Sequence, residues 1–106
     1  GWWKDRAGAA RRLLHRLERL DGLDSAYPDI VLVVEGQARA IADGDDVVVV
    51  RADSSGDDAI VAEASRFAAD GRSVTVVTSD RGLITRVTSA GASTRGTRWL
   101  LDQLPA

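Results

Sequence analysis

Acidic side chains follow three apolar runs of this chain, near the point where each run ends. Glu35 follows the first run, Asp53, Asp57 and Asp58 lie in the polar loop after the second, and Asp80 follows the third. Carboxylates that collect in one place repel one another unless a cation or a bound proton offsets their charge. Because carboxylate oxygens are preferred ligands of hard cations, these acids predict a site for Mg²⁺ or Mn²⁺.

The segment Thr78-Ser79-Asp80-Arg81 has the densest chemistry, since it combines two hydroxyls, a carboxylate and a guanidinium. Asp80 would bind the metal, while Arg81 would bind a phosphate through its fork of N–H donors. Ser79 and Thr78 would orient a bound water or a phosphate oxygen. The start of a following helix would also favour an anion at this turn.

Each of these residues also has an ordinary structural role, which the sequence leaves open. Asp57, Asp58 and Asp80 precede or begin helical patterns, and Asp is a favoured helix N-cap. Glu35 and Asp53 are equally compatible with solvated loop positions, and Ser79 and Thr78 with local capping. Arg81 is likewise compatible with an ordinary surface position.

The elements that must position these residues follow from hydrophobic periodicity. Apolar residues at spacings of three and four predict a helix at 5–20, and β-branched runs predict strands at 30–34, 47–50 and 74–78. Further helical patterns are predicted from residue 58 to Asp70-Gly71, from residue 83 to Gly91, and at 97–104. The segment 37–46 reads as a polar connection with a helical turn, and 92–95 as a short edge strand.

Continuous apolar strands that alternate with helices are typical of a parallel sheet covered on both faces. The predicted fold class is therefore α/β, a three-layer Rossmann-like fold with a mainly parallel sheet flanked by helices. In such a sheet, ligands bind beyond the carboxyl ends of the strands, where the acids are expected to gather.

Composition limits the remaining possibilities. A chain of 106 residues is expected to form a single domain at 1–106, and the absence of cysteine excludes a disulfide framework or a thiolate metal site. The one histidine, His15, lies off the apolar stripe of its helix and is expected at the surface. No run is long enough for a membrane span and no signal peptide opens the chain, so a cytoplasmic location is expected.

Four segments resemble a known family: "SGDDAIVAEA", "VTVVTSDRGL", the closing "GTRWLLDQL" and the opening "GWWKDRAGAARRLL". Together they resemble the NYN domains of the PIN-like nuclease superfamily, in particular the small bacterial YacP-type forms. The resemblance implies a PIN-like fold and metal-dependent hydrolysis of RNA. It implies Asp58 and Asp80 as catalytic metal ligands, with Asp57 as the substitute for Asp58, and Arg81, Arg39 and Ser79 as contacts to the RNA.

The family carries its first acid at the end of an amino-terminal strand, and this sequence has no such strand. The absence of methionine agrees with an expected truncation ahead of Gly1. A homo-oligomer or a partner chain would then supply the missing strand, or the fragment would be inactive.

Two other functions stay open. A non-catalytic RNA-binding or protein-binding PIN-like module fits the missing first acid. The run "LVVEG", which ends at Glu35-Gly36, resembles the glutamate motif of the Mg²⁺-binding Toprim fold, but Gly82 stands where that fold needs a second Asp.

Overall fold

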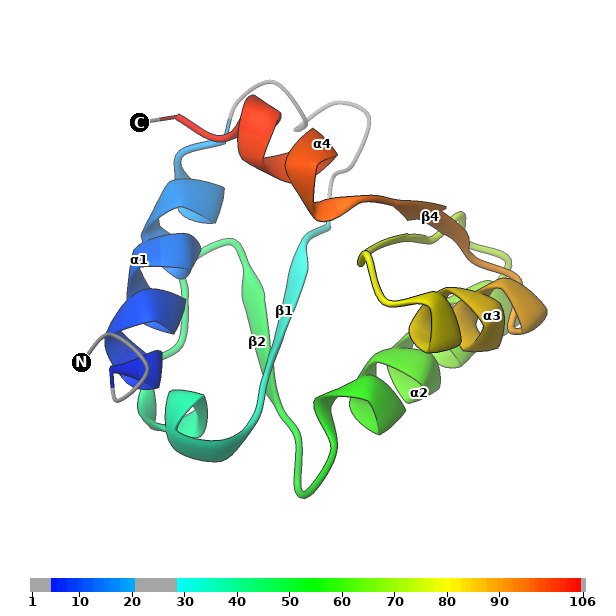
Figure 1. The fold of residues 1–106 in the computed structure, drawn as a ribbon, viewed down its shortest axis with the longest axis horizontal. Coiled ribbons are helices and arrows are strands. Elements are labelled where there is room, and N and C mark those ends of the chain that lie inside the picture. Colours follow the sequence, from blue (N-terminus) through cyan, green and yellow to red (C-terminus); the bar gives the residue numbers. More distant parts are fainter. Residues whose placement is uncertain (1–4, 21–28, 106) are drawn as a thin grey trace. The chain divides into compact units, whose positions relative to one another are not determined.

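The structure is a computed structural model that describes residues 5–20 and 29–105. The described chain is mixed α/β and forms two compact units. Of the described residues, the first contains 5–20, 29–56 and 103–105, and the second contains 57–102. Each unit contains one pair of parallel strands (Figure 1).

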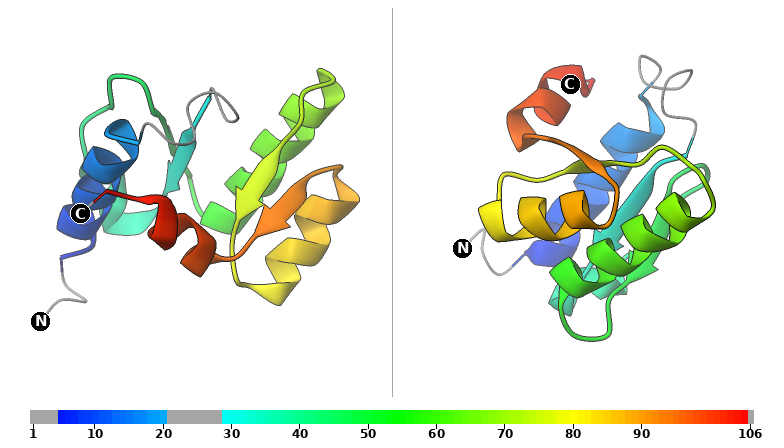
Figure 2. Two further views of the ribbon diagram at one scale, coloured as in Figure 1. Left: turned by 90° about the horizontal axis from the view of Figure 1, so that it is seen from above. Right: turned by 90° about the vertical axis from the view of Figure 1, so that its right-hand side faces the viewer.

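The first unit is built around the pair β1–β2, with Val31 opposite Val48 and Val34 opposite Arg51. Figures 1 and 2 show helix α1 alongside this pair. Its elements in chain order are α1 (Arg6–Glu18), β1 (Val31–Val34), the 3₁₀ helix η2 (Gly36–Ala40) and β2 (Val48–Arg51).

Helix α1 confirms the predicted capping and periodicity. Asp5 is its N-cap, and the carboxylate of Asp5 accepts a hydrogen bond from the Gly8 N–H at 3.1 Å. Leu14 and Leu17 on the apolar stripe are each 6% exposed, whereas His15 is exposed as expected. The apolar stripe therefore fixes which face of α1 packs inward.

The prediction that the strands are buried on both faces is wrong for this pair. Only Val34 of β1 is fully buried, β2 has no buried residue, and Val48 is 55% exposed. Within residues 5–20 and 29–105, each strand of this pair has one neighbouring strand and so lacks the side chains that a second neighbour would place beside its own. The β-branched composition therefore predicted the strands correctly but overestimated their burial.

The second unit is built around the pair β3–β4, in which Thr75 lies opposite Ser93 and Val77 opposite Arg95. Its elements are α2 (Gly56–Ala69), β3 (Thr75–Val77), α3 (Arg81–Ser89), β4 (Ser93–Arg95) and α4 (Thr97–Gln103), with the first residue of α2 and the last of α4 assigned to the first unit.

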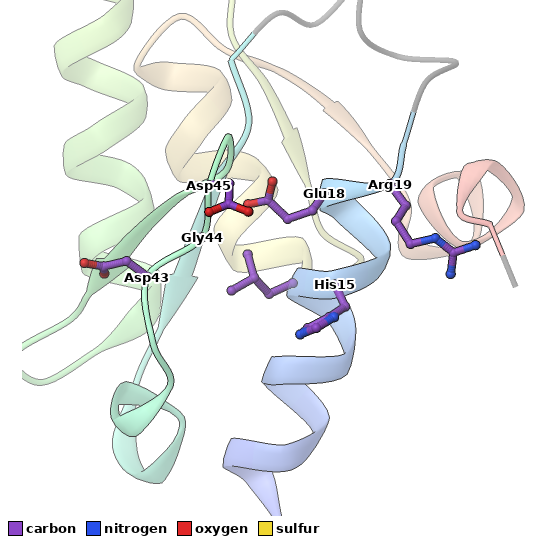
Figure 3. Close-up of a pocket in the computed structure, with 7 residues that line it drawn as sticks. His15, Glu18, Arg19, Asp43, Gly44 and Asp45 are labelled. Carbon is purple, nitrogen blue, oxygen red and sulfur yellow. The ribbon is translucent and has the colours of Figure 1, made fainter.

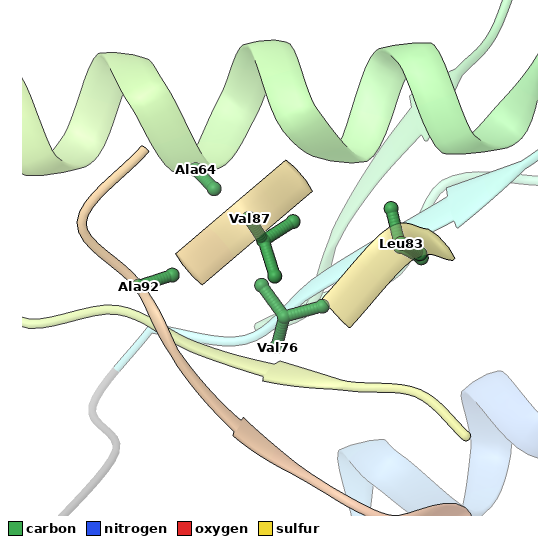
Figure 4. Close-up of a cluster of buried hydrophobic side chains, with 5 residues drawn as sticks. All are labelled: Ala64, Val76, Leu83, Val87 and Ala92. Atoms are coloured by element: carbon green, nitrogen blue, oxygen red, sulfur yellow. The ribbon is translucent and has the colours of Figure 1, made fainter. Parts of the chain in front are cut away.

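One hydrophobic cluster holds the second unit together. It joins Ala64 of α2, Val76 of β3, Leu83 and Val87 of α3, and Ala92 just before β4 (Figure 4). Val87 is completely buried and Leu83 is 3% exposed. Since α2, β3 and α3 all contribute side chains to this cluster, a shared core holds the three elements together.

Candidate functional site

The turn from β3 into α3 contains the residues that the sequence singled out. Asp80 is the N-cap of α3, and its Oδ1 accepts a hydrogen bond from the Leu83 N–H at 2.8 Å. The buried Thr78 hydroxyl accepts the Asp80 N–H at 3.1 Å. The capping role that the sequence left open for Asp80 is therefore confirmed, and the local hydrogen bonds fix the backbone of the turn.

This turn is tied to the turn that follows β4. The Ser79 and Thr97 hydroxyls lie 3.1 Å apart, and the Thr97 N–H donates to Ser79 Oγ at 3.2 Å. Because β3 and β4 are parallel, the two turns leave the carboxyl ends of neighbouring strands. Arg81, Ser79 and Thr97 are all exposed there.

The other two acids lie in the first turn of α2. Asp57 and Asp58 are both exposed, and Asp58 Oδ1 accepts a hydrogen bond from Arg86 of α3 at 2.7 Å. The side chains of this ion pair are 65% and 46% exposed, so the pair adds little stability. It nevertheless shows that the start of α2 lies within reach of an α3 side chain.

The structure thus places Asp57, Asp58, Ser79, Asp80 and Arg81 in one compact unit. No group of three or more Asp, Glu, His or Cys side chains that could hold a metal ion occurs among residues 5–20 and 29–105. A binding site for Mg²⁺ or Mn²⁺ stays a prediction.

The remaining candidates belong to the first unit. Glu35, at the end of β1, accepts a hydrogen bond from the Gly56 N–H at 2.6 Å, so it stabilises the chain at the start of α2. Arg39 is exposed on η2, and its carbonyl accepts from Arg51 Nε at 3.0 Å. Asp53 is an exposed loop residue. The placement of Arg39 with Asp58 and Asp80 stays a prediction.

Glu18 makes a charged contact that the sequence did not predict. Its carboxylate accepts hydrogen bonds from the backbone N–H groups of Asp46 and Val47, at 2.9 Å for the shortest contact to each. The Val47 N–H is the main cause that lowers the pKa of Glu18; burial opposes this, and the Asp46 and Asp45 N–H groups and His15 lower it further.

Figure 3 shows Glu18 extending from α1 towards the loop of Asp43, Gly44 and Asp45, beside a shallow pocket that these residues line. The run Gly44-Asp45-Asp46 is a turn signal, but nothing local identifies a carboxylate 28 residues earlier as its partner.

Comparison with protein-family models, with curated proteins and with solved structures gave no match. No helix within the described ranges has the length and apolar character needed to cross a membrane.

Proposed function

We propose that this chain is a metal-dependent ribonuclease domain of the NYN type, with Asp58 and Asp80 as its metal ligands. The proposal includes the three-layer PIN-like fold that the sequence predicts. The observation that carries it is the common location of these two acids, each at the start of a helix in one compact unit.

The order of the elements supports their proximity. Helix α2 leads through a short turn into β3, and Figure 2 shows the two elements running in opposite directions. The start of α2 then lies at the same end of the unit as the end of β3, where Asp80 follows.

Two carboxylates are a sufficient protein donor set for Mg²⁺ bound together with its substrate. Mg²⁺ keeps several waters and is commonly held by one or two carboxylates plus substrate phosphates. Asp80 Oδ1 accepts a hydrogen bond from the Leu83 N–H, and Asp58 Oδ1 accepts one from Arg86. Bound there, the ion would lower the pKa of a water ligand and neutralise phosphate charge.

The residues around the acids would bind and orient the RNA. Arg81 is exposed beside Asp80, and its guanidinium would bind a non-bridging phosphate oxygen and stabilise the charge that develops on it. The Ser79 hydroxyl is fixed by Thr97 and would donate to a second phosphate oxygen. Arg86 would orient the carboxylate of Asp58.

A non-catalytic RNA-binding module is the second candidate. It is favoured by the structural roles of both acids, since Asp80 caps a helix and Asp58 joins α2 to α3 through Arg86. These roles would explain the two residues without any metal.

The test is cleavage of a fluorescently labelled single-stranded RNA by the full chain with Mn²⁺. Asp58→Asn, Asp80→Asn and the double variant are compared with Asp70→Asn, which removes an exposed acid after the far end of α2. We expect a loss of at least about a hundredfold in the double variant, because a metal site loses its charged ligands, and no change in the control. Cleavage that persists in the double variant, or RNA binding by the wild type without cleavage, contradicts the proposal.

A further inference from the structure

An arginine-rich surface lies at the carboxyl ends of β3 and β4. The sequence has four arginines and no acidic residue between Asp80 and Asp102. Arg81, Arg95 and Arg98 are exposed, and the Ser79–Thr97 hydrogen bonds hold the two turns that carry Arg81 and Arg98 together. This concentration of positive charge favours a polyanion.

Within this surface, Arg95 makes a cation–π contact with an aromatic ring. Its guanidinium carbon lies 5.7 Å from the centre of the half-buried Trp99 ring. Its backbone is fixed as well, because the Arg95 carbonyl accepts the Thr78 N–H at 2.9 Å. An exposed guanidinium that an aromatic ring contacts on one side can offer its other side to a base.

We propose that single-stranded RNA binds across the carboxyl ends of β3 and β4, with one base stacked on the guanidinium of Arg95 and phosphates bound by Arg81 and Arg98. Unpaired bases stack on arginine planes and aromatic rings, whereas bases inside a duplex are not accessible to such stacking. The geometry therefore selects a single strand over a duplex. The choice of RNA rests on the proposed function, but the mode of binding does not require cleavage.

The experiment measures binding of a fluorescein-labelled single-stranded oligoribonucleotide to the full chain by anisotropy in EDTA, where metal-dependent cleavage cannot occur. Arg95→Lys keeps the charge and removes the plane, and we expect about tenfold weaker binding. The matched control is Arg72→Lys, since Arg72 lies 5.0 Å from the centre of the Phe67 ring but precedes β3, at its opposite end. This control is expected to bind as the wild type does.

Two further comparisons separate stacking from charge. An oligonucleotide with abasic sites should bind wild type and Arg95→Lys equally, because it has no base to stack. Arg81→Ala and Arg98→Ala should each reduce the slope of log affinity against log salt by about 0.7, whereas Arg95→Lys should leave it unchanged.

Equal binding of normal RNA by wild type and Arg95→Lys would overturn the inference, as would an equal loss with normal and abasic RNA or a preference for duplex. Because binding is read without metal, a failure here leaves the nuclease proposal standing. Conversely, inactivity of the wild type leaves the binding mode standing.

Discussion

Replacing Glu18 should loosen the loop that leads into β2. The carboxylate of Glu18 accepts the Asp46 N–H with both oxygens, at 2.9 and 3.1 Å, and the Val47 N–H at 2.9 Å. Val47 is 4% exposed, so its N–H needs a partner within the protein. A side chain at Gly44 would collide with the same carboxylate, which shows how closely the loop surrounds it.

The size of the effect follows from two N–H groups bound to one charged acceptor. Hydrogen bonds to charged groups contribute about 1.5–3 kcal/mol each, and water at this half-buried carboxylate reduces that contribution. Glu18→Gln keeps a carbonyl acceptor but loses the charge, so we expect a loss of about 1–2 kcal/mol. Glu18→Ala removes both contacts and should cost about 2–3 kcal/mol.

The same contacts give the effect a pH dependence of defined sign. The pKa of Glu18 in the folded chain lies below its ordinary value of 4.5, mainly because of the Val47 N–H. A carboxyl whose pKa is lowered by folding stabilises the folded state above its unfolded pKa. The contribution is therefore complete above pH 4.5 and lost as the pH falls through the folded value. The difference in the free energy of unfolding between wild type and Glu18→Gln should therefore shrink as the pH falls below 4.5.

Amide hydrogen exchange at Asp46 and Val47 measures the local loss of protection. Urea denaturation at pH 7 and in acid measures the total loss in the free energy of unfolding. Glu63→Gln is the control, since half-buried Glu63 makes an ion pair with exposed Arg66 one turn away on α2, and the loss of that pair should cost under about 0.5 kcal/mol. Unchanged protection of Asp46 and Val47 in Glu18→Gln at pH 7, or a difference that grows in acid, would refute the reasoning.

Two further predictions concern the second unit. Asp80→Ala should destabilise it by about 1 kcal/mol, because the Leu83 N–H loses its acceptor. Asp80→Asn should be nearly neutral, because Asn caps a helix equally well. Urea denaturation of the two variants measures the difference. Leu83→Ala should cost about 2–4 kcal/mol by opening a cavity beside Val76 and Val87. Its control, Leu101→Ala, removes a side chain that is 54% exposed and should change stability by under about 0.5 kcal/mol; an equal loss in both variants would contradict the assignment of the core.

The sequence predicted the local elements well because their signals are local. Asp5 ahead of an apolar stripe predicted the start of α1, and the β-branched runs predicted β1, β2 and β3. The glycines at 71 and 91 follow α2 and α3 with φ angles of +80° and +101°, which a side chain would disfavour, so both helix ends were readable.

The contacts that define the candidate site were not readable in this way. Ser79 and Thr97 are 18 positions apart, and Asp58 and Arg86 are 28 positions apart, so neither pair has a sequence signature. The cation–π contact between Arg95 and Trp99 spans the turn from β4 into α4. The predicted burial of the strands was wrong for the same reason. The exposure of Val48 depends on the neighbours of β2 and not on the composition of the strand.

Substitutions of Asp80 can distinguish a structural from a catalytic role, because a helix cap and a metal ligand need different properties of the same side chain. A cap needs an oxygen that accepts the Leu83 N–H, and the amide oxygen of Asn provides it. A hard cation that neutralises phosphate charge needs a negatively charged ligand, which Asn is not. Asp80→Asn therefore keeps the fold and removes only the charge. If that variant keeps its stability but loses cleavage, capping alone cannot explain why Asp occupies this position.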